Sequence, residues 1–188
     1  FFICEAPVTQ AQWEKVMGTN PSMHKGSDNP VENVSWLDCQ EFITKMNDIE
    51  PGKKFRLPSE SEWEYAARAG SKKSFCCGNG QSVYEKYAWY DHNSGNKTHP
   101  VKSKEPNRFG VYDCHGNVGE WCQDHWFDNY DSGPFDNSPR LGKGIGKRVR
   151  RGGSAILPAE YCTASARHRH DEGERMFDVG FRLAMEID

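Results

Sequence analysis

The chain has 188 residues, 36% of them hydrophobic, and a formal net charge of −3 at pH 7. This length suits one ordinary domain with a sizeable core, and we predict a single domain over residues 1–188. Lysine and arginine are scattered along the chain and no basic face shows, which argues against nucleic acid binding. No segment approaches the roughly 20 apolar residues of a membrane-spanning helix, so we expect no transmembrane segment in this chain.

The first third of the chain predicts one strand and then helices with well-marked starts. The apolar FFICE at the N-terminus is typical of a strand. Thr9 and Gln12 have capping-box spacing, and Gly18 ends the helix that they begin. A second helix is predicted to begin at Ser35. Its apolar residues recur at helical spacing, at Trp36, Cys39, Phe42, Ile43 and Met46.

The third predicted helix lies in PSESEWEYAARAG. Ser59 and Glu62 form another capping box, and Gly70 ends the helix. Glu60, Glu62 and Glu64 could indicate acid–base catalysis, but three glutamates on one helix more often form a charged, solvated face. We expect that face to be exposed.

After this helix the chain becomes rich in glycine, asparagine and proline, with single aromatic residues between turns. Short strands are predicted at Val149–Arg151 and Phe181–Met185, and most of the remainder is predicted to be ordered loop. The seven cysteines show no CxxC metal spacing, and their odd number leaves at least one free thiol. A vicinal pair such as Cys76–Cys77 rarely closes a disulfide, so we expect unpaired, partly buried cysteines that act as small hydrophobic residues.

Six motifs in this order resemble the formylglycine-generating-enzyme (sulfatase-modifying factor) family. They are PVTQAQWEKVMGTNPS, NPVENVSWLDCQEF, FRLPSESEWEYAARAG, NRFGVYDCHGNVGEWCQDHW, RRGGS and GFRLA. The resemblance covers essentially the whole chain. It implies an α+β structure of the C-type-lectin fold, rich in loops, with small twisted antiparallel sheets and two or three helices.

The GNVGEW motif leaves two alternatives open for Asn117 and Glu120. The glycines allow turns that place both side chains against neighbouring backbone or against a cation. The family sometimes binds calcium in this region, and these oxygen ligands would suit calcium. The other alternative is structural hydrogen bonding, with no cofactor.

The resemblance also bears on catalysis. Enzymes of the family oxidise a substrate cysteine with two of their own cysteines, which lie five positions apart and bind copper. Alignment on RRGGS and GFRLA places these positions at Leu157 and Cys162. Leucine offers no lone pair to Cu(I), so we predict that the chain is not an enzyme. Another branch uses iron held by three histidines on a separate helical domain, which this chain lacks. His168 and His170 could contribute to a metal site, but two histidines on a loop are more often exposed side chains, which is what we expect here.

Near its two ends the segment 148–184 carries the ordered motifs RRGGS and VGFRLA. The residues between these motifs follow neither a helical nor a strand period. This arrangement resembles the variable proteins of diversity-generating retroelements, in which asparagine codons mutated at adenines reach Ala, Ile, Leu, Pro, Tyr and His. The resemblance implies a display protein that binds an unknown protein or glycan, exported or held at the cell surface by an anchor outside this chain. The alternative is a cysteine oxidase or an inactive relative. The candidate ligand-binding residues are Ala155, Ile156, Leu157, Tyr161, Ala166, His168, His170, Met176 and Phe177.

Overall fold

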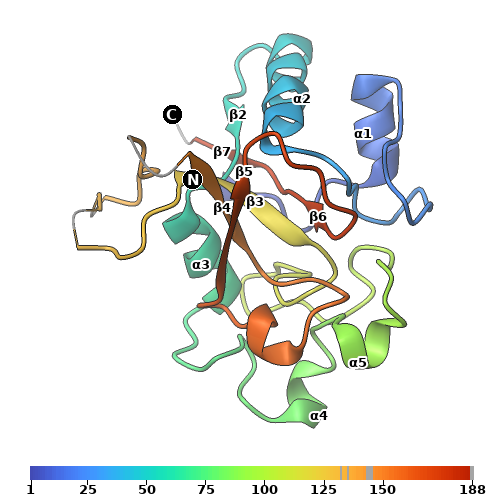
Figure 1. The fold of residues 1–188 in the computed structure, drawn as a ribbon, viewed down its shortest axis with the longest axis vertical. Helices are drawn as coiled ribbons and strands as arrows, with labels where there is room; N and C mark the ends of the chain where they lie inside the picture. The colour runs from blue at the N-terminus through green and yellow to red at the C-terminus, as the bar shows by residue number, and fades with distance from the viewer. Residues whose placement is uncertain (132, 135, 143–145, 187–188) are drawn as a thin grey trace.

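The computed structural model describes residues 1–131, 133–134, 136–142 and 146–186. Two helices, α1 (Gln10–Met17) and α2 (Trp36–Ile49), lie at one end of the molecule, and the single-turn helices α4 (Gln81–Tyr84) and α5 (Asp91–Ser94) lie at the other (Figure 1). Small sheets lie between these ends, with α3 (Glu60–Arg68) beside them. The α+β prediction is therefore confirmed. The sequence predicts α1, α2 and α3, and the structure has two further helices, α4 and α5, of a single turn each.

Two small sheets organise the chain. The three-stranded sheet has the order β1–β7–β2, formed by Phe2–Ile3, Ala184–Met185 and Phe55–Arg56. The four-stranded sheet has the order β5–β4–β3–β6, formed by Arg167–Asp171, Lys147–Arg151, Gly119–His125 and Val179–Gly180. Every strand pair is antiparallel except β3 with β6, which is parallel. The predicted strand over 181–185 is wrong in extent, because the chain leaves one sheet at β6 and joins the other at β7.

The helix starts follow the predicted local chemistry. The hydroxyls of Thr9 and Ser59 each accept a hydrogen bond from the backbone N–H three residues on, and the side chains of Gln12 and Glu62 accept one in return. Gly18 ends α1 with a φ of 77°, in the left-handed region that glycine adopts without steric cost. These signals involve neighbours in sequence, which is why they can be read without tertiary structure.

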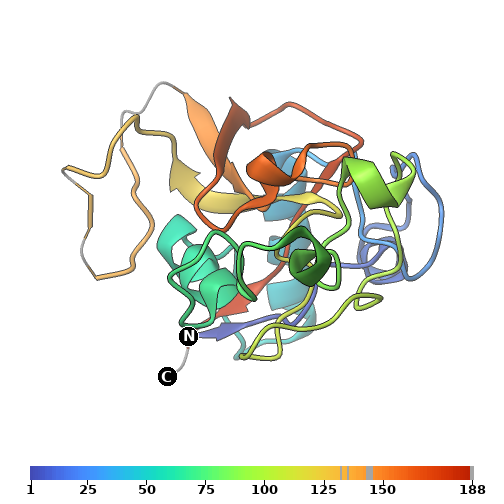
Figure 2. The same cartoon turned by 90° about the horizontal axis from the view of Figure 1, so that it is seen from below.

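The largest core cluster joins α1 and α2 to the C-terminal strands. Trp13 stacks on Phe42 with ring centroids 5.3 Å apart, and Phe181 meets both rings edge-on. Trp121 of β3 is fully buried in the same cluster and donates its indole N–H to the Val34 carbonyl at 3.0 Å. This core packs against the four-stranded sheet through Trp121 and Val179, and β5 is one of the two edge strands of that sheet (Figure 2).

Candidate ligand-binding surface

The two glycines of RRGGS allow the chain to turn from β4 into the candidate region. Both have positive φ, 92° at Gly152 and 70° at Gly153. A Cβ at Gly153 would lie 2.5 Å from the Cys162 sulfur and 2.6 Å from the Tyr161 carbonyl oxygen. No side chain fits there, so Gly153 sets the close approach of β4 to the single 3₁₀ turn Ala159–Cys162.

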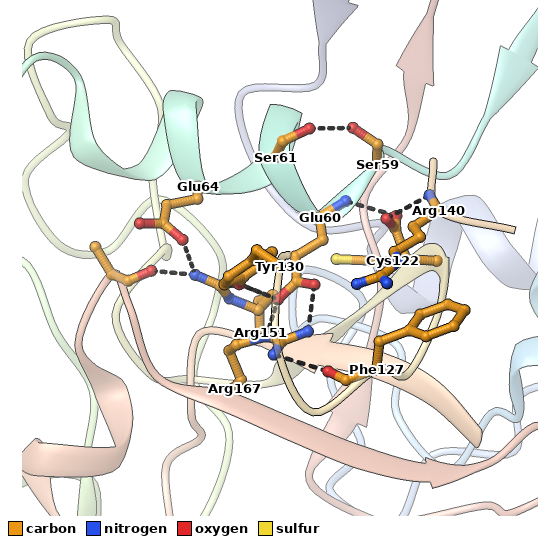
Figure 3. A network of polar contacts seen from close by, with 12 residues as sticks. Ser59, Glu60, Ser61, Glu64, Cys122, Phe127, Tyr130, Arg140, Arg151 and Arg167 are labelled. Atoms are coloured by element: carbon orange, nitrogen blue, oxygen red, sulfur yellow. Dashed lines mark hydrogen bonds and ion pairs between the residues drawn. The ribbon is translucent and has the colours of Figure 1, made fainter. Parts of the chain in front are cut away.

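An ion-pair network joins strands β4 and β5, which flank the candidate region, to helix α3. Glu60 lies between Arg151 of β4 and Arg167 of β5, as Figure 3 shows. Arg167 donates to both Glu60 oxygens, at 2.5 and 2.8 Å, and Arg151 also reaches Glu64. Glu60 and Glu62 are buried, so the expected exposed glutamate face is wrong. Burial is favourable here because each buried carboxylate has an arginine partner.

Strand β5 carries the middle of the candidate region. His168 and His170 were expected on a loop, but the structure places both in this strand, half-buried. The strand alternation places them on one face, opposite Arg167, Arg169 and Asp171. Their pairing partners on β4 are Arg150 for His168 and Arg148 for His170. The two histidines therefore lie beside two arginines on the same face of the sheet.

The nine candidate residues differ in exposure. Tyr161 and Phe177 are exposed, at 47% and 41%, whereas Ala155 is buried. The expectation that Ala155 faces solvent is wrong, because its N–H donates to the Asn117 carbonyl and its carbonyl accepts from the Ser94 hydroxyl. The remaining six candidates are half-buried: Ile156, Leu157, Ala166, His168, His170 and Met176.

Two of these candidates line an open hollow of about 530 Å³. Met176 and Phe177 contribute apolar surface from the turn before β6, and Pro21 and Met23 contribute apolar surface from the loop after α1. Three polar residues complete the lining, namely Asn33, Arg175 and Asp178. Sequence patterns did not point to residues 21–33, which reach the hollow only through the tertiary fold.

The positions aligned with the copper cysteines lie just beneath this surface. Leu157 packs against a buried cluster that includes Phe75, Ala88, Tyr90 and Cys162. Burial raises the pKa of the Cys162 thiol to about 12. The Cys162 sulfur approaches the backbone oxygens of Ser154 and Leu157, at 3.6 and 3.9 Å. All seven cysteines carry free thiols. A protonated, enclosed Cys162 thiol is a packing group and a poor nucleophile.

Asn117 and Glu120 are both fully buried and hydrogen-bonded to protein groups. The Asn117 amide oxygen accepts the His99 N–H at 2.9 Å, and its NH₂ donates to the His99 carbonyl. Both Glu120 oxygens accept from Arg182, and one also accepts from the Trp63 indole. This geometry supports the structural alternative for the two residues. Across the described parts of the chain, no group of three or more His, Cys, Asp or Glu side chains is arranged to hold a metal ion.

The fold and this surface define a lectin-like α+β scaffold whose C-terminal half forms a partly apolar face. The family model for the sulfatase-modifying factor enzyme 1-like domain matches residues 1–187, and the chain belongs to this family. The C-type-lectin-like fold predicted for the chain is confirmed by the solved structures of relatives.

Three relatives describe the range of the family. Treponema denticola variable protein 1 is 35% identical, with a TM-score of 0.88 over 96% of this chain and 82% of that chain. PvdO from Pseudomonas aeruginosa is 31% identical, with a TM-score of 0.88 over 98% of this chain and 80% of that chain. The formylglycine-generating enzyme of Mus musculus is 34% identical over 96% of this chain. The chain spans only 50% of that enzyme's length.

Proposed function

We propose that this chain is a display protein whose C-terminal region binds a ligand on a rigid scaffold. The observation that carries the proposal is the contrast between the borders of the region and its middle. Arg151 and Phe181 at the borders are fully buried, whereas Tyr161 and Phe177 between them are exposed aromatic residues. Anchoring recognition residues on fixed strands lowers the entropy lost on binding, and exposed aromatic side chains are frequent binding hot spots.

Diversification by a retroelement is part of this proposal, and the likeness to the treponemal variable protein supports it. The test is genomic. We expect a reverse-transcriptase gene near the coding sequence, together with a near-copy of the segment encoding 148–184 that differs only at adenines. Absence of both would overturn diversification and leave an invariant binding or structural protein.

The second candidate function is cysteine oxidation, which the identity to formylglycine-generating enzymes favours. Residue 157 argues against it. In the proposed alignment Leu157 replaces one of the two copper-binding cysteines, and a single Cys162 thiol cannot supply a two-sulfur Cu(I) site. The chain is therefore proposed to be a non-catalytic member of the family.

The proposed ligand is a protein or a glycan outside the cell, reached by a protein that is exported or anchored at the surface. No helix among the described residues is long and apolar enough to span a membrane. Protease shaving of intact cells, followed by detection of this chain, tests the location.

A further inference from the structure

Among the buried arginines of the four-stranded sheet, Arg148, Arg150 and Arg151, Arg150 makes the fewest side-chain hydrogen bonds. Its neighbour Arg151 donates to Glu60, Glu64 and a backbone carbonyl, each at 2.5 Å. Arg150 is also buried, at 4% exposure, yet within the described ranges it makes one hydrogen bond, from Nη1 to Asp178 at 3.4 Å. Its buried Nε has no partner in those ranges. A guanidinium offers five donors, so most of the hydrogen-bonding capacity of Arg150 is unused.

Such a buried cation is costly unless its charge is paired at close range. Burial is the main cause that lowers the pKa of the Arg150 guanidinium, and the Asp178 carboxylate, its ion-pair partner at 3.4 Å, only partly opposes it. Gly119 makes room for the side chain, since a Cβ there would lie 2.7 Å from the Arg150 Cδ. The fold thus places the arginine at this position without giving it a full set of partners.

The position of Arg150 connects it to the proposed recognition surface. It pairs with His168 across the β4–β5 ladder, and His170 lies one alternation further along the same face. Asp178, its single partner, lines the hollow that Phe177 and Met176 also line. Five per cent of the Arg150 side-chain surface remains open to solvent. Arg150 therefore shares one face of the sheet with His168 and His170, two of the residues proposed to touch the ligand.

We propose that Arg150, flanked by His168 and His170, receives the carboxylate of an aspartate or glutamate side chain from a protein ligand. This inference rests on the proposed function and deepens it, because it names the chemistry of the bound group. An incoming carboxylate accepts from the Nη donors that Asp178 leaves free, in a charge-assisted contact that suits guanidinium groups. The imidazole N–H groups of the two histidines offer further donors at the rim.

A protein ligand fits this surface better than an acidic glycan does. The hollow that Asp178 lines is apolar along Pro21, Met23, Met176 and Phe177, and Met23 is 67% exposed. Tyr161 lies beside His168, with ring centroids 5.8 Å apart. Tyrosine, phenylalanine, methionine and arginine are the residue types enriched in protein–protein interfaces. Apolar residues around a charged contact exclude water from it. An ion pair in such a setting contributes to the selectivity for one protein partner.

The first test uses acetate as the carboxylate probe and acetamide as its neutral counterpart, at constant ionic strength set with chloride. Arginine Nε–H and histidine ring resonances are followed by NMR in the intact chain. We expect acetate, and not acetamide, to cause saturable shifts at Arg150, His168 and His170. Shifts spread evenly over exposed arginines, or none at Arg150, would overturn the proposal. This readout uses the wild-type protein and needs no variant to fold.

The second test compares two substitutions that remove one positive charge each. Arg150→Gln is expected to weaken acetate binding about tenfold or more, as loss of a charge-assisted contact should. Arg169→Gln, on the opposite face of β5 and partnered by Asp128, is expected to change it less than about twofold. Equal effects would overturn the proposal, as would site-specific binding of sulfate or a sulfated oligosaccharide without acetate binding. A chain that binds no carboxylate but has an adenine-mutated template repeat would still be a diversified display protein.

Discussion

Glu120 and Arg182 form a fully buried ion pair between β3 and the segment that precedes β7. The guanidinium donates from Nε and Nη2 to the two carboxylate oxygens, both at 2.6 Å, and neither side chain is exposed. Trp63 donates a third hydrogen bond to Glu120 at 2.8 Å, and Arg182 also reaches the carbonyls of Cys4 and Tyr112. This pair and its hydrogen bonds thus connect five segments of the chain, around Cys4, Trp63, Tyr112, Glu120 and Arg182.

Glu120→Gln is expected to lower the free energy of unfolding by about 3–5 kcal/mol, because it leaves the Arg182 charge buried without its counterion. Equilibrium urea unfolding at neutral pH measures the change. The matched control is Arg175→Gln, which breaks the bidentate but exposed pair with Asp38. That loss should stay below about 1 kcal/mol, and equal losses in the two variants would contradict this account.

The sequence predicts the structure well where the interacting residues are near neighbours. Both predicted capping boxes, at Thr9 and Ser59, are formed, since their partners lie three residues away. The segment around RHRHD shows no apolar periodicity, so the sequence predicts a loop for His168 and His170, whereas the structure has a strand there.

Contacts between distant segments account for the other differences from prediction. Glu60 has the pattern of a solvated helix face, but its partner Arg167 lies 107 residues further along the chain. Ala155 looks like part of an exposed loop, and its burial depends on Ser94 and Asn117. No local pattern encodes either arrangement. The hollow beside Phe177 could not be predicted for the same reason, because Pro21, Met23 and Asn33 line it from a distant part of the chain.

The scaffold and the recognition residues should differ sharply in tolerance to substitution. Tyr161→Ala and Phe177→Ala remove exposed side chains and should each change the free energy of unfolding by no more than about 0.5 kcal/mol. Trp121→Ala removes a fully buried ring and its hydrogen bond to Val34, and should cost about 3–5 kcal/mol. Urea melts of the three variants test this. A larger loss for either surface variant than for Trp121→Ala would count against the display proposal.

Within the candidate region, the buried position Ala155 should tolerate substitution less well than the exposed positions do. Ala155→Leu should destabilise the chain by about 1–3 kcal/mol, because a larger side chain must enter a packed site at a position that is 1% exposed. A melt at neutral pH measures the loss. A neutral outcome would mean that the segment around Ala155 can move outward and join the surface.

His115 should make the protein sensitive to acid. The Cys76 N–H donates to Nε2 at 3.1 Å, so the ring proton is on Nδ1, which donates to the Cys162 carbonyl at 2.9 Å. Burial lowers the pKa of this imidazole from 6.5 to about 4. The unfolded chain therefore takes up a proton first as the pH falls. The stability contributed by neutral His115 is complete above about pH 6.5 and is lost as the pH falls towards about 4.

For a pKa difference of this size the loss is about 3 kcal/mol between those limits. His115→Gln keeps one donor and one acceptor but does not titrate, so its unfolding free energy should fall less steeply over the same range. Urea unfolding of both proteins at several pH values compares the slopes, which are independent of any constant cost of the substitution. Parallel slopes would show that His115 is not the responsible group.

Leu157→Cys tests the proposed absence of catalysis most directly, because it restores the five-residue spacing to Cys162. We expect neither tight Cu(I) binding nor oxidation of a cysteine peptide. The site around Leu157 is an apolar cluster, and burial raises the pKa of the Cys162 thiol to about 12, which disfavours the thiolate that copper requires. Copper stoichiometry under reducing conditions and mass spectrometry of the peptide are the measurements, with Leu157→Ala as the control for lost packing. Turnover by the wild-type chain would refute the non-enzyme proposal. Turnover by Leu157→Cys alone would identify a recently disabled oxidase that has kept its substrate groove.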